Sequence, residues 1–213
     1  YTGQMIAKAD LTVKNVNFDG KGYNGYAIET RDANYLTVED CTAKNYGYGL
    51  IQLASGTVLT TVKNVTIVNC NYGVKVDYSN AVVLENVDIT VGVAGVLNSN
   101  YGGKTITIKN SKINILGTWT RNNTVKTNYL FEGNNTIDAF VVDEAIDTFK
   151  LAADATLTAP NDITVKTDVD GSLVLYENGV YKTKPTVVKI GEQGYATLAA
   201  AIAAANAGDT ITF

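Results

Sequence analysis

The segment Leu11-Thr-Val-Lys-Asn-Val-Asn-Phe18 recurs four more times along the chain without gaps. The other copies are Leu36-Thr-Val-Glu-Asp-Cys-Thr-Ala43, Thr60-Thr-Val-Lys-Asn-Val-Thr-Ile67, Val82-Val-Leu-Glu-Asn-Val-Asp-Ile89 and Ile106-Thr-Ile-Lys-Asn-Ser-Lys-Ile113. The fifth positions are separated by 25, 24, 22 and 24 residues, and a weaker sixth copy follows around Phe131-Glu-Gly-Asn134. A repeat of this period, with short apolar segments, predicts a solenoid of stacked coils.

Within each copy, apolar residues alternate with polar ones, which is typical of a strand with one buried face. The alternation changes phase at the fifth position, so the chain must bend there. Asn tolerates the left-handed backbone conformation that a sharp bend requires. In stacked coils these side chains would lie ~4.8 Å apart and could form a hydrogen-bonded ladder. The expected ladder consists of Asn15, Asp40, Asn64, Asn86 and Asn110.

The position before each bend carries charges of alternating sign. These residues are Lys14, Glu39, Lys63, Glu85, Lys109 and Glu132. Parallel strands in register would place each Lys beside a Glu, and such pairs contribute roughly 0.2–1 kcal/mol each. The alternation therefore predicts which strands lie side by side.

The pattern Val62-Lys-Asn-Val-Thr-Ile67, followed by Tyr72-Gly-Val74, resembles the right-handed parallel β-helix of the pectate-lyase-like fold. The resemblance implies an all-β solenoid of about six coils over residues 1–142. The repeat of this sequence is also similar to the repeat regions of bacterial cell-surface and adhesin-like proteins. The pattern is specific for the fold and says little about activity.

The last third of the chain lacks the repeat. Residues 143–184 are expected to form a connector with a hairpin that turns at Asn178-Gly179. Residues 185–213 are expected to contain a helix over 198–207, capped by Thr197 and ended by Gly208, and a strand over 209–213. So small and apolar a helix should be buried against another surface.

This C-terminal module resembles the entry module of bacterial β-helix surface proteins, in which a helix covers the first coil. Its expected plug residues are Leu198, Ile202, Ile211 and Phe213. The chain then represents one unit of a tandem array, a fragment of a larger protein, or a subunit that joins others head to tail. In the last case the module of one subunit would complete the open coil of the next.

Composition excludes several function classes. The 213 residues contain no His, which excludes catalytic triads and proton shuttles that depend on an imidazole. The formal net charge of −4 argues against a nucleic-acid partner, and no apolar run approaches the ~18 residues of a membrane span. Two cysteines, Cys41 and Cys70, are too few for a metal knuckle, and whether they pair is left open.

Polysaccharide lyases and hydrolases are well-known enzymes of the fold that the repeat resembles. Only Arg31 and Arg121 provide guanidinium groups, and the strand acids alternate with lysines. We therefore expect no catalysis, cofactor or metal. Tyr23, Tyr48 and Tyr72 each follow a ladder residue by eight positions and should stack in one column, with Trp119 beyond it. The column is either an aromatic filler of a turn, which we favour, or a glycan platform.

The sequence thus predicts a non-catalytic, extracellular structural or adhesin-like segment of a bacterial surface protein. One alternative is a subunit of a head-to-tail filament, with itself or adjacent repeats as partner. Another is a carbohydrate-binding or polysaccharide-cleaving β-helix.

Overall fold

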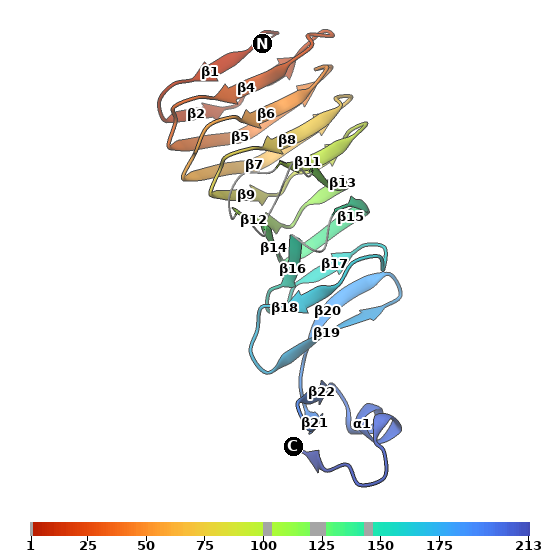
Figure 1. Ribbon diagram of the computed structural model, residues 1–213. Coiled ribbons are helices and arrows are strands. Elements are labelled where there is room, and N and C mark those ends of the chain that lie inside the picture. Colours follow the sequence, from red (N-terminus) through yellow and green to blue (C-terminus); the bar gives the residue numbers. More distant parts are fainter. Residues whose placement is uncertain (1, 100–103, 120–126, 143–146) are drawn as a thin grey trace.

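The computed structural model describes residues 2–99, 104–119, 127–142 and 147–213. Its main body is a stack of parallel coils, and the C-terminal module lies beyond the end opposite the N-terminus (Figure 1). Strands of successive coils pair in parallel along three faces, which we call A, B and C. The stack is thus the predicted all-β parallel solenoid of about six coils.

Face A begins at the N-terminus and receives one strand from each coil. Its strands are β1 (Met5–Ala7), β4 (Tyr26–Thr30), β6 (Gly49–Leu53), β8 (Tyr72–Val76), β11 (Ala94–Ser99) and the ends of β13 (Lys112–Trp119) and β15 (Asn134–Val141).

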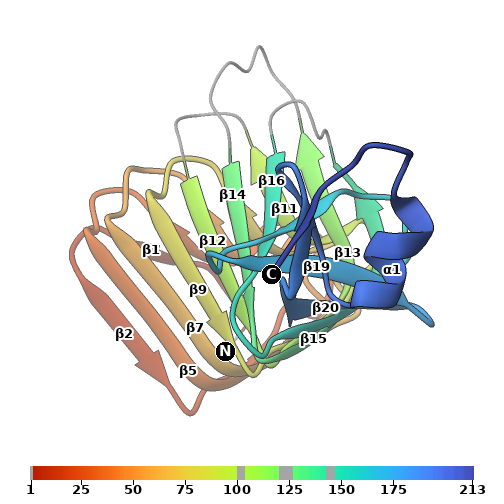
Figure 2. The same ribbon diagram turned by 90° about the horizontal axis from the view of Figure 1, so that it is seen from below.

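Face B is parallel throughout, and Figure 2 shows its strands side by side from β2 to β14. It contains β2 (Leu11–Lys14), the first halves of β5 (Tyr35–Lys44) and β7 (Leu59–Val68), β9 (Ala81–Glu85), β12 (Lys104–Lys109), β14 (Thr127–Glu132), β16 (Asp147–Leu151) and β18 (Val165–Thr167).

Face C follows the bend in each coil and ends in an antiparallel hairpin. It contains β3 (Asn17–Asp19), the second halves of β5 and β7, β10 (Asp88–Thr90), the first halves of β13 and β15, β17 (Thr156–Thr158), β20 (Val180–Pro185) and β19 (Ser172–Glu177).

The bend between faces B and C lies at the predicted ladder. All five residues have a left-handed backbone, with φ between 48° and 56°. Asn64 Nδ2 donates to Asp40 Oδ1 at 2.8 Å, and Asn86 Nδ2 donates to Asn64 Oδ1 at 3.2 Å. In the sixth coil Gly133 occupies this position with φ 64°, because a Cβ there would collide with the Asn110 carboxamide.

A second ladder, which the sequence did not predict, lies at the corner after face C. Asn45 and Asn69 have φ of 59° and 52°, and Asn69 Nδ2 donates to Asn45 Oδ1. Asn45 Nδ2 in turn donates to Asp19 Oδ1 at 2.9 Å. Side-chain amides therefore link neighbouring coils at two corners.

The charge alternation sets the register as predicted. Lys14 lies opposite Glu39, Glu39 opposite Lys63, Lys63 opposite Glu85, and Lys109 between Glu85 and Glu132. Ion pairs join Lys14 to Glu39 at 2.5 Å and Lys63 to Glu85 at 3.4 Å. Because the lysine side chains are 52% and 38% exposed, water screens these pairs, and they specify alignment more than they stabilise the fold.

Inward columns fill the core between the faces. The third position of each copy, such as Val38 and Ile108, is buried, and so is the position three residues after the bend, such as Phe18 and Ile113. Cys41 occupies an inward column as predicted. Cys41 and Cys70 are buried free thiols and form no disulfide.

The last third differs from the prediction at two points and agrees with it at a third. The parallel ladder continues past residue 142, through β16 and β17 to β18, so the β-helix ends about one coil later than expected. The hairpin runs to Pro185, just past the expected end of the connector at 184, because Pro185 pairs with Ser172 of β19. The predicted hairpin turn is present, with φ of 50° at Asn178 and 81° at Gly179.

The C-terminal module contains the small antiparallel sheet of β21 (Val188–Ile190), β22 (Gln193–Tyr195) and β23 (Ile211–Thr212), and helix α1 (Leu198–Ala204). Thr197 caps α1 as predicted, accepting from Ala200 N at 3.1 Å. The helix was expected to continue to residue 207 and to end at Gly208. It ends at Ala204 instead, because the backbone becomes extended at Ala205.

The corner geometry generates a stability prediction at Asn64. Asn64→Ala should lower the free energy of unfolding by about 2 kcal/mol, because alanine loses the ladder hydrogen bonds and tolerates φ 53° poorly. Thermal melts followed by circular dichroism measure the change. Asn64→Gly is the control, since glycine loses the bonds but accepts the backbone conformation, and it should be the milder variant. Equal melting temperatures for both variants would contradict this account of the corner.

Candidate functional site

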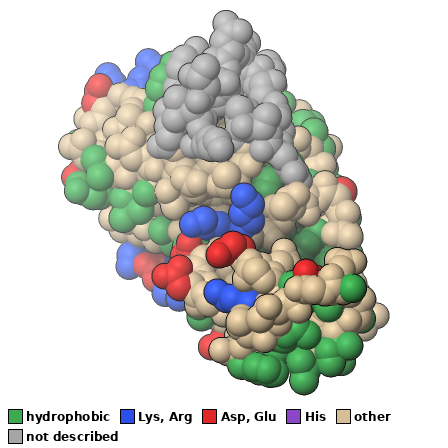
Figure 3. All heavy atoms as spheres, turned by 60° about the horizontal axis from the view of Figure 1, so that its bottom comes forward, with side chains coloured by type: hydrophobic (Ala, Val, Ile, Leu, Met, Phe, Trp, Pro, Cys, Tyr) green, Lys and Arg blue, Asp and Glu red, His purple; other side chains and the backbone are tan. Residues whose placement is uncertain are grey.

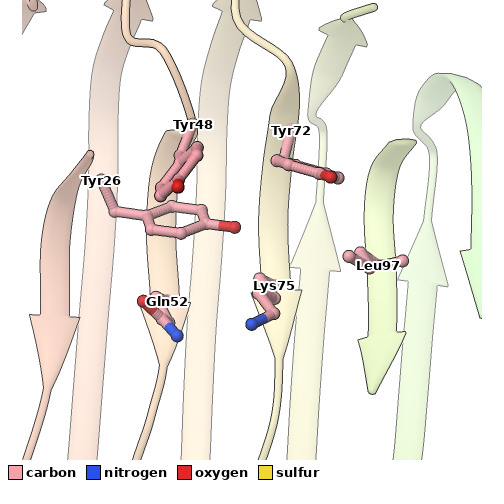
Figure 4. Close-up of a pocket in the computed structure, with 6 residues that line it drawn as sticks. All are labelled: Tyr26, Tyr48, Gln52, Tyr72, Lys75 and Leu97. Atoms are coloured by element: carbon pink, nitrogen blue, oxygen red, sulfur yellow. The ribbon is translucent and has the colours of Figure 1, made fainter. Parts of the chain in front are cut away.

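A groove on face A collects three tyrosines from neighbouring coils. Tyr26 of β4 and Tyr72 of β8 occupy the same column, with Gly49 of β6 between them. Tyr48, just before β6, leans over the gap that Gly49 leaves (Figure 4). The ring centroids of Tyr48 lie 5.4 Å from those of Tyr26 and 6.4 Å from those of Tyr72. The three rings form one aromatic cluster.

Polar groups form the other wall of the groove. Gln52 and Lys75 occupy adjacent positions in the next outward column, and Figure 4 shows their amide and amine on the same side as the rings. With Leu97 of β11 they line a cavity of about 250 Å³. The groove thus combines aromatic surface with amide and ammonium donors.

Asp77 holds this polar wall in place. It accepts from Gln52 Nε2 at 2.9 Å and from the Ser99 hydroxyl, and its carboxylate lies 3.2 Å from Lys75 Nζ. Because the ammonium and the carboxylate are paired, the groove carries little net charge. Such a surface suits a neutral polar ligand better than an ion.

The tyrosines differ in what they offer to solvent. Tyr26 is buried, and its desolvation raises the pKa of its phenol far above the usual range. Tyr48 is 44% exposed and Tyr72 is half-buried. Tyr26 is therefore a packing residue, and the accessible aromatic surface belongs to Tyr48 and Tyr72.

The predicted column of Tyr23, Tyr48 and Tyr72 is wrong at two members, because the register neighbour of Tyr72 is Gly49 rather than Tyr48, and Tyr23 lies outside the column. Tyr23 packs edge-on against Tyr46, with ring centroids 6.3 Å apart, and Tyr26 takes the place expected for Tyr23. The first coil has two additional turn residues, Lys21 and Gly22, both at positive φ, which displace the register. The Trp119 side chain and Arg121 lie outside the described residues.

A second polar cluster lies inside the β-helix, and the sequence prediction missed it. Lys104 of β12 is only 2% exposed, and its Nζ donates to Val76 O at 2.7 Å, to Asn98 Oδ1 at 3.0 Å and to Ser99 O. The sequence did contain a signal. Lys104 precedes Ile106 and Ile108 at period two, which places its side chain inward.

The predicted plug residues lie together on the C-terminal module but are not buried. Leu198, Ile202 and Phe213 are 42%, 59% and 87% exposed, and Ile211 pairs with Ile190 in the small sheet. Ala201 is the one buried residue of α1. The expectation of a buried helix is thus not met within this chain, and hydrophobic side chains gather on the surface at this end of the molecule (Figure 3).

Two further features bear on function. In the described part of the chain, no group of three or more Cys, Asp or Glu side chains gathers where it could hold a metal ion. No described helix is long and apolar enough to cross a membrane.

Comparison with known proteins identifies the repeat region. A family model described as a right-handed β-helix region matches residues 4–149, more than half of the chain. No curated protein and no solved structure matches the sequence significantly.

The groove depends on the close approach of strands at Gly49, which a substitution can test. A Cβ at Gly49 would collide with the Tyr72 carbonyl oxygen, so Gly49→Ala should destabilise the protein by about 1–3 kcal/mol and alter the near-ultraviolet circular dichroism of the tyrosines. Gly56→Ala is the matched control, because the nearest atom to its Cβ, Tyr78 O, lies 3.8 Å away. If the two variants melt alike, the packing of face A differs from this description.

Proposed function

The chain belongs to the right-handed β-helix family, and we propose that it is a non-catalytic structural unit of an extracellular bacterial surface protein. In this proposal the C-terminal module of one unit covers the first coil of the next β-helix. That next β-helix belongs to a second copy of this chain, so the assembly is a head-to-tail filament. The observation that carries the proposal is the contrast between the two ends of the solenoid.

The N-terminal end presents unpaired edges and part of the core. β1, β2 and β3 each pair with one strand of the second coil, and within the described residues their outer edges have no partner strand. Met5, Leu11 and Val16 are only partly buried around the core here. Such an edge favours pairing with another chain.

The opposite end of the solenoid is closed along face C. β20 pairs antiparallel with β17, and β19 pairs with β20, so the hairpin ends the ladder of face C. The C-terminal module lies beyond this hairpin and exposes Leu198, Ile202 and Phe213. Within the described residues, the solenoid thus has an unpaired first coil and an apolar surface beyond its other end, which supports addition of identical units in one direction.

The strand acids support a structural rather than a catalytic role. Glu39 and Glu85 are each aligned with lysines of neighbouring coils and lie away from the groove. The carboxylate that adjoins the groove, Asp77, is held by three partners. The placement outside the cell rests on the likeness of the repeat to surface-protein β-helices.

Assembly is tested by light scattering and negative-stain microscopy of the purified chain. The natural sequence should form filaments of uniform width. The double substitution Ile202→Glu with Phe213→Glu should yield monomers, because charges would be buried at the junction. Ala203→Glu is the control for added charge on another side of α1, since Ala203 is also exposed.

The double variant keeps an intact N-terminal coil, which sharpens the test. Added to the natural chain in small amounts, it should bind filament ends and shorten the filaments. A natural chain that stays monomeric at every concentration would refute head-to-tail assembly. Filaments that are unaffected by the double variant would show that the contact between units lies on a surface other than that of Ile202 and Phe213.

The groove on face A favours a second function, binding of a neutral oligosaccharide. Tyr48 and Tyr72 offer ring faces on which a pyranose can stack, and Gln52 and Lys75 provide donors beside them. The pairing of Lys75 with Asp77 favours an uncharged sugar over a uronate.

Calorimetric titration with neutral oligosaccharides and with oligogalacturonates tests this function. We expect neutral sugars to bind and Tyr48→Ala to weaken binding about tenfold. Tyr35→Ala is the control, because Tyr35 is 51% exposed and lies outside the groove. Equal loss in both variants, or no heat from any sugar, would leave the tyrosines as packing residues.

A further inference from the structure

Three successive coils place a polar residue in the same inward column of face B. Lys104, Thr127 and Asp147 begin β12, β14 and β16, and they are 2%, 1% and 3% exposed. Each is followed at period two by large apolar residues, such as Ile106, that close the core beside it. A lysine, a hydroxyl and a carboxylate are thus stacked in a space shielded from water.

Asn98 faces this column from β11 on face A and is 1% exposed. Its Oδ1 accepts from Lys104 Nζ at 3.0 Å, while its Nδ2 donates to Thr127 Oγ1 at 2.8 Å. The lysine amine therefore lies against the carboxamide of Asn98, and the amide nitrogen is directed toward the hydroxyl next in the column.

The environment prepares the amine for reaction. Burial lowers the pKa of Lys104 to about 8, although the charges of Asp77 and Asp147 oppose the shift and that of Lys75 adds to it. About a tenth of the amine is then uncharged at pH 7, and that fraction has a lone pair to donate. The apolar walls and the exclusion of water protect an amide from competing hydrolysis.

Asp147 belongs to the same column, and its charge acts on the Lys104 amine. It is the register neighbour of Thr127, which binds the Asn98 amide nitrogen, and it accepts from Thr118 Oγ1 at 2.6 Å. Asp77 is held instead by Lys75, Gln52 and Ser99 at the edge of the groove. Asp147 is therefore the better candidate for the proton carrier.

We propose that Lys104 and Asn98 form an intramolecular isopeptide bond. The Lys104 Nζ lone pair attacks Asn98 Cγ, and the new C–N bond forms as the carbonyl becomes tetrahedral. The Asp147 carboxylate takes a proton from Nζ and returns it to the departing Nδ2. The Cγ–Nδ2 bond then breaks and ammonia leaves, so the reaction needs no oxidant, cofactor or second protein.

The bond would staple β11 to β12, and thus face A to face B, in the middle of the solenoid. It closes a short loop between residues 98 and 104, so it would resist local opening of this coil more than it would constrain the unfolded chain. The proposal does not depend on head-to-tail assembly or on sugar binding.

Mass spectrometry of the intact, denatured protein tests the bond. The natural chain should be lighter than its sequence mass by one ammonia. A peptide map should show residues 98 and 104 in one cross-linked species that trypsin does not cleave after Lys104. A full sequence mass, with Lys104 recovered as a free amine in the map, would overturn the proposal without any variant.

Variants separate the isopeptide from cyclisation at Asn98-Ser99, which also expels ammonia. Lys104→Met and Asn98→Ala should both restore the full mass, whereas Lys109→Met, on the outward face of the same strand, should keep the deficit. Asp147→Asn should slow the mass loss after refolding. A deficit that survives Lys104→Met would assign the lost ammonia to cyclisation and refute the cross-link.

Discussion

Every coil of the β-helix passes from face B to face C through a residue in the left-handed backbone conformation, and this corner sets the register of the stack. Asp40, Asn64 and Asn86 can adopt it because their short polar side chains tolerate positive φ. The same side chains bond to the neighbouring coil, so one residue both turns the chain and joins it to the next turn. Once the corners are aligned, the lysines and glutamates that precede them lie side by side in one column. The apolar residues on either side of the corner then point inward.

An inward column can hold a polar side chain where a residue on another face provides a hydrogen-bond partner. Elsewhere in the core the inward columns hold mainly Val, Leu and Ile, and dispersion and burial suffice. From Lys104 onward one column is polar, and each group finds a partner on another face: the amine on Asn98, the Asn98 amide on Thr127, and the Asp147 carboxylate on Thr118. The close packing of a lysine against a carboxamide makes this cluster chemically unusual, since neither group is accessible to water.

Two surfaces arise from departures from the regular repeat. The groove exists because Gly49 leaves a gap in the column that Tyr26 and Tyr72 occupy, and Tyr48 fills it from the preceding turn. The assembly surface exists because the hairpin of β19 and β20 closes the solenoid and leaves α1 outside it.

The sequence by itself determined the solenoid, its register and its inward columns, because the ladder residues and alternating charges repeat at a fixed period and each position has one physical role. It also determined the Asn178-Gly179 turn and the Thr197 cap, which are local. Only the tertiary structure decided that Tyr26 replaces Tyr23, because two turn residues shifted the first coil. Likewise, it alone decided that Lys104 meets Asn98 and that α1 is exposed. These outcomes depend on which side chains from different faces meet across the core. The repeat period of the sequence does not specify which side chains on different faces come into contact.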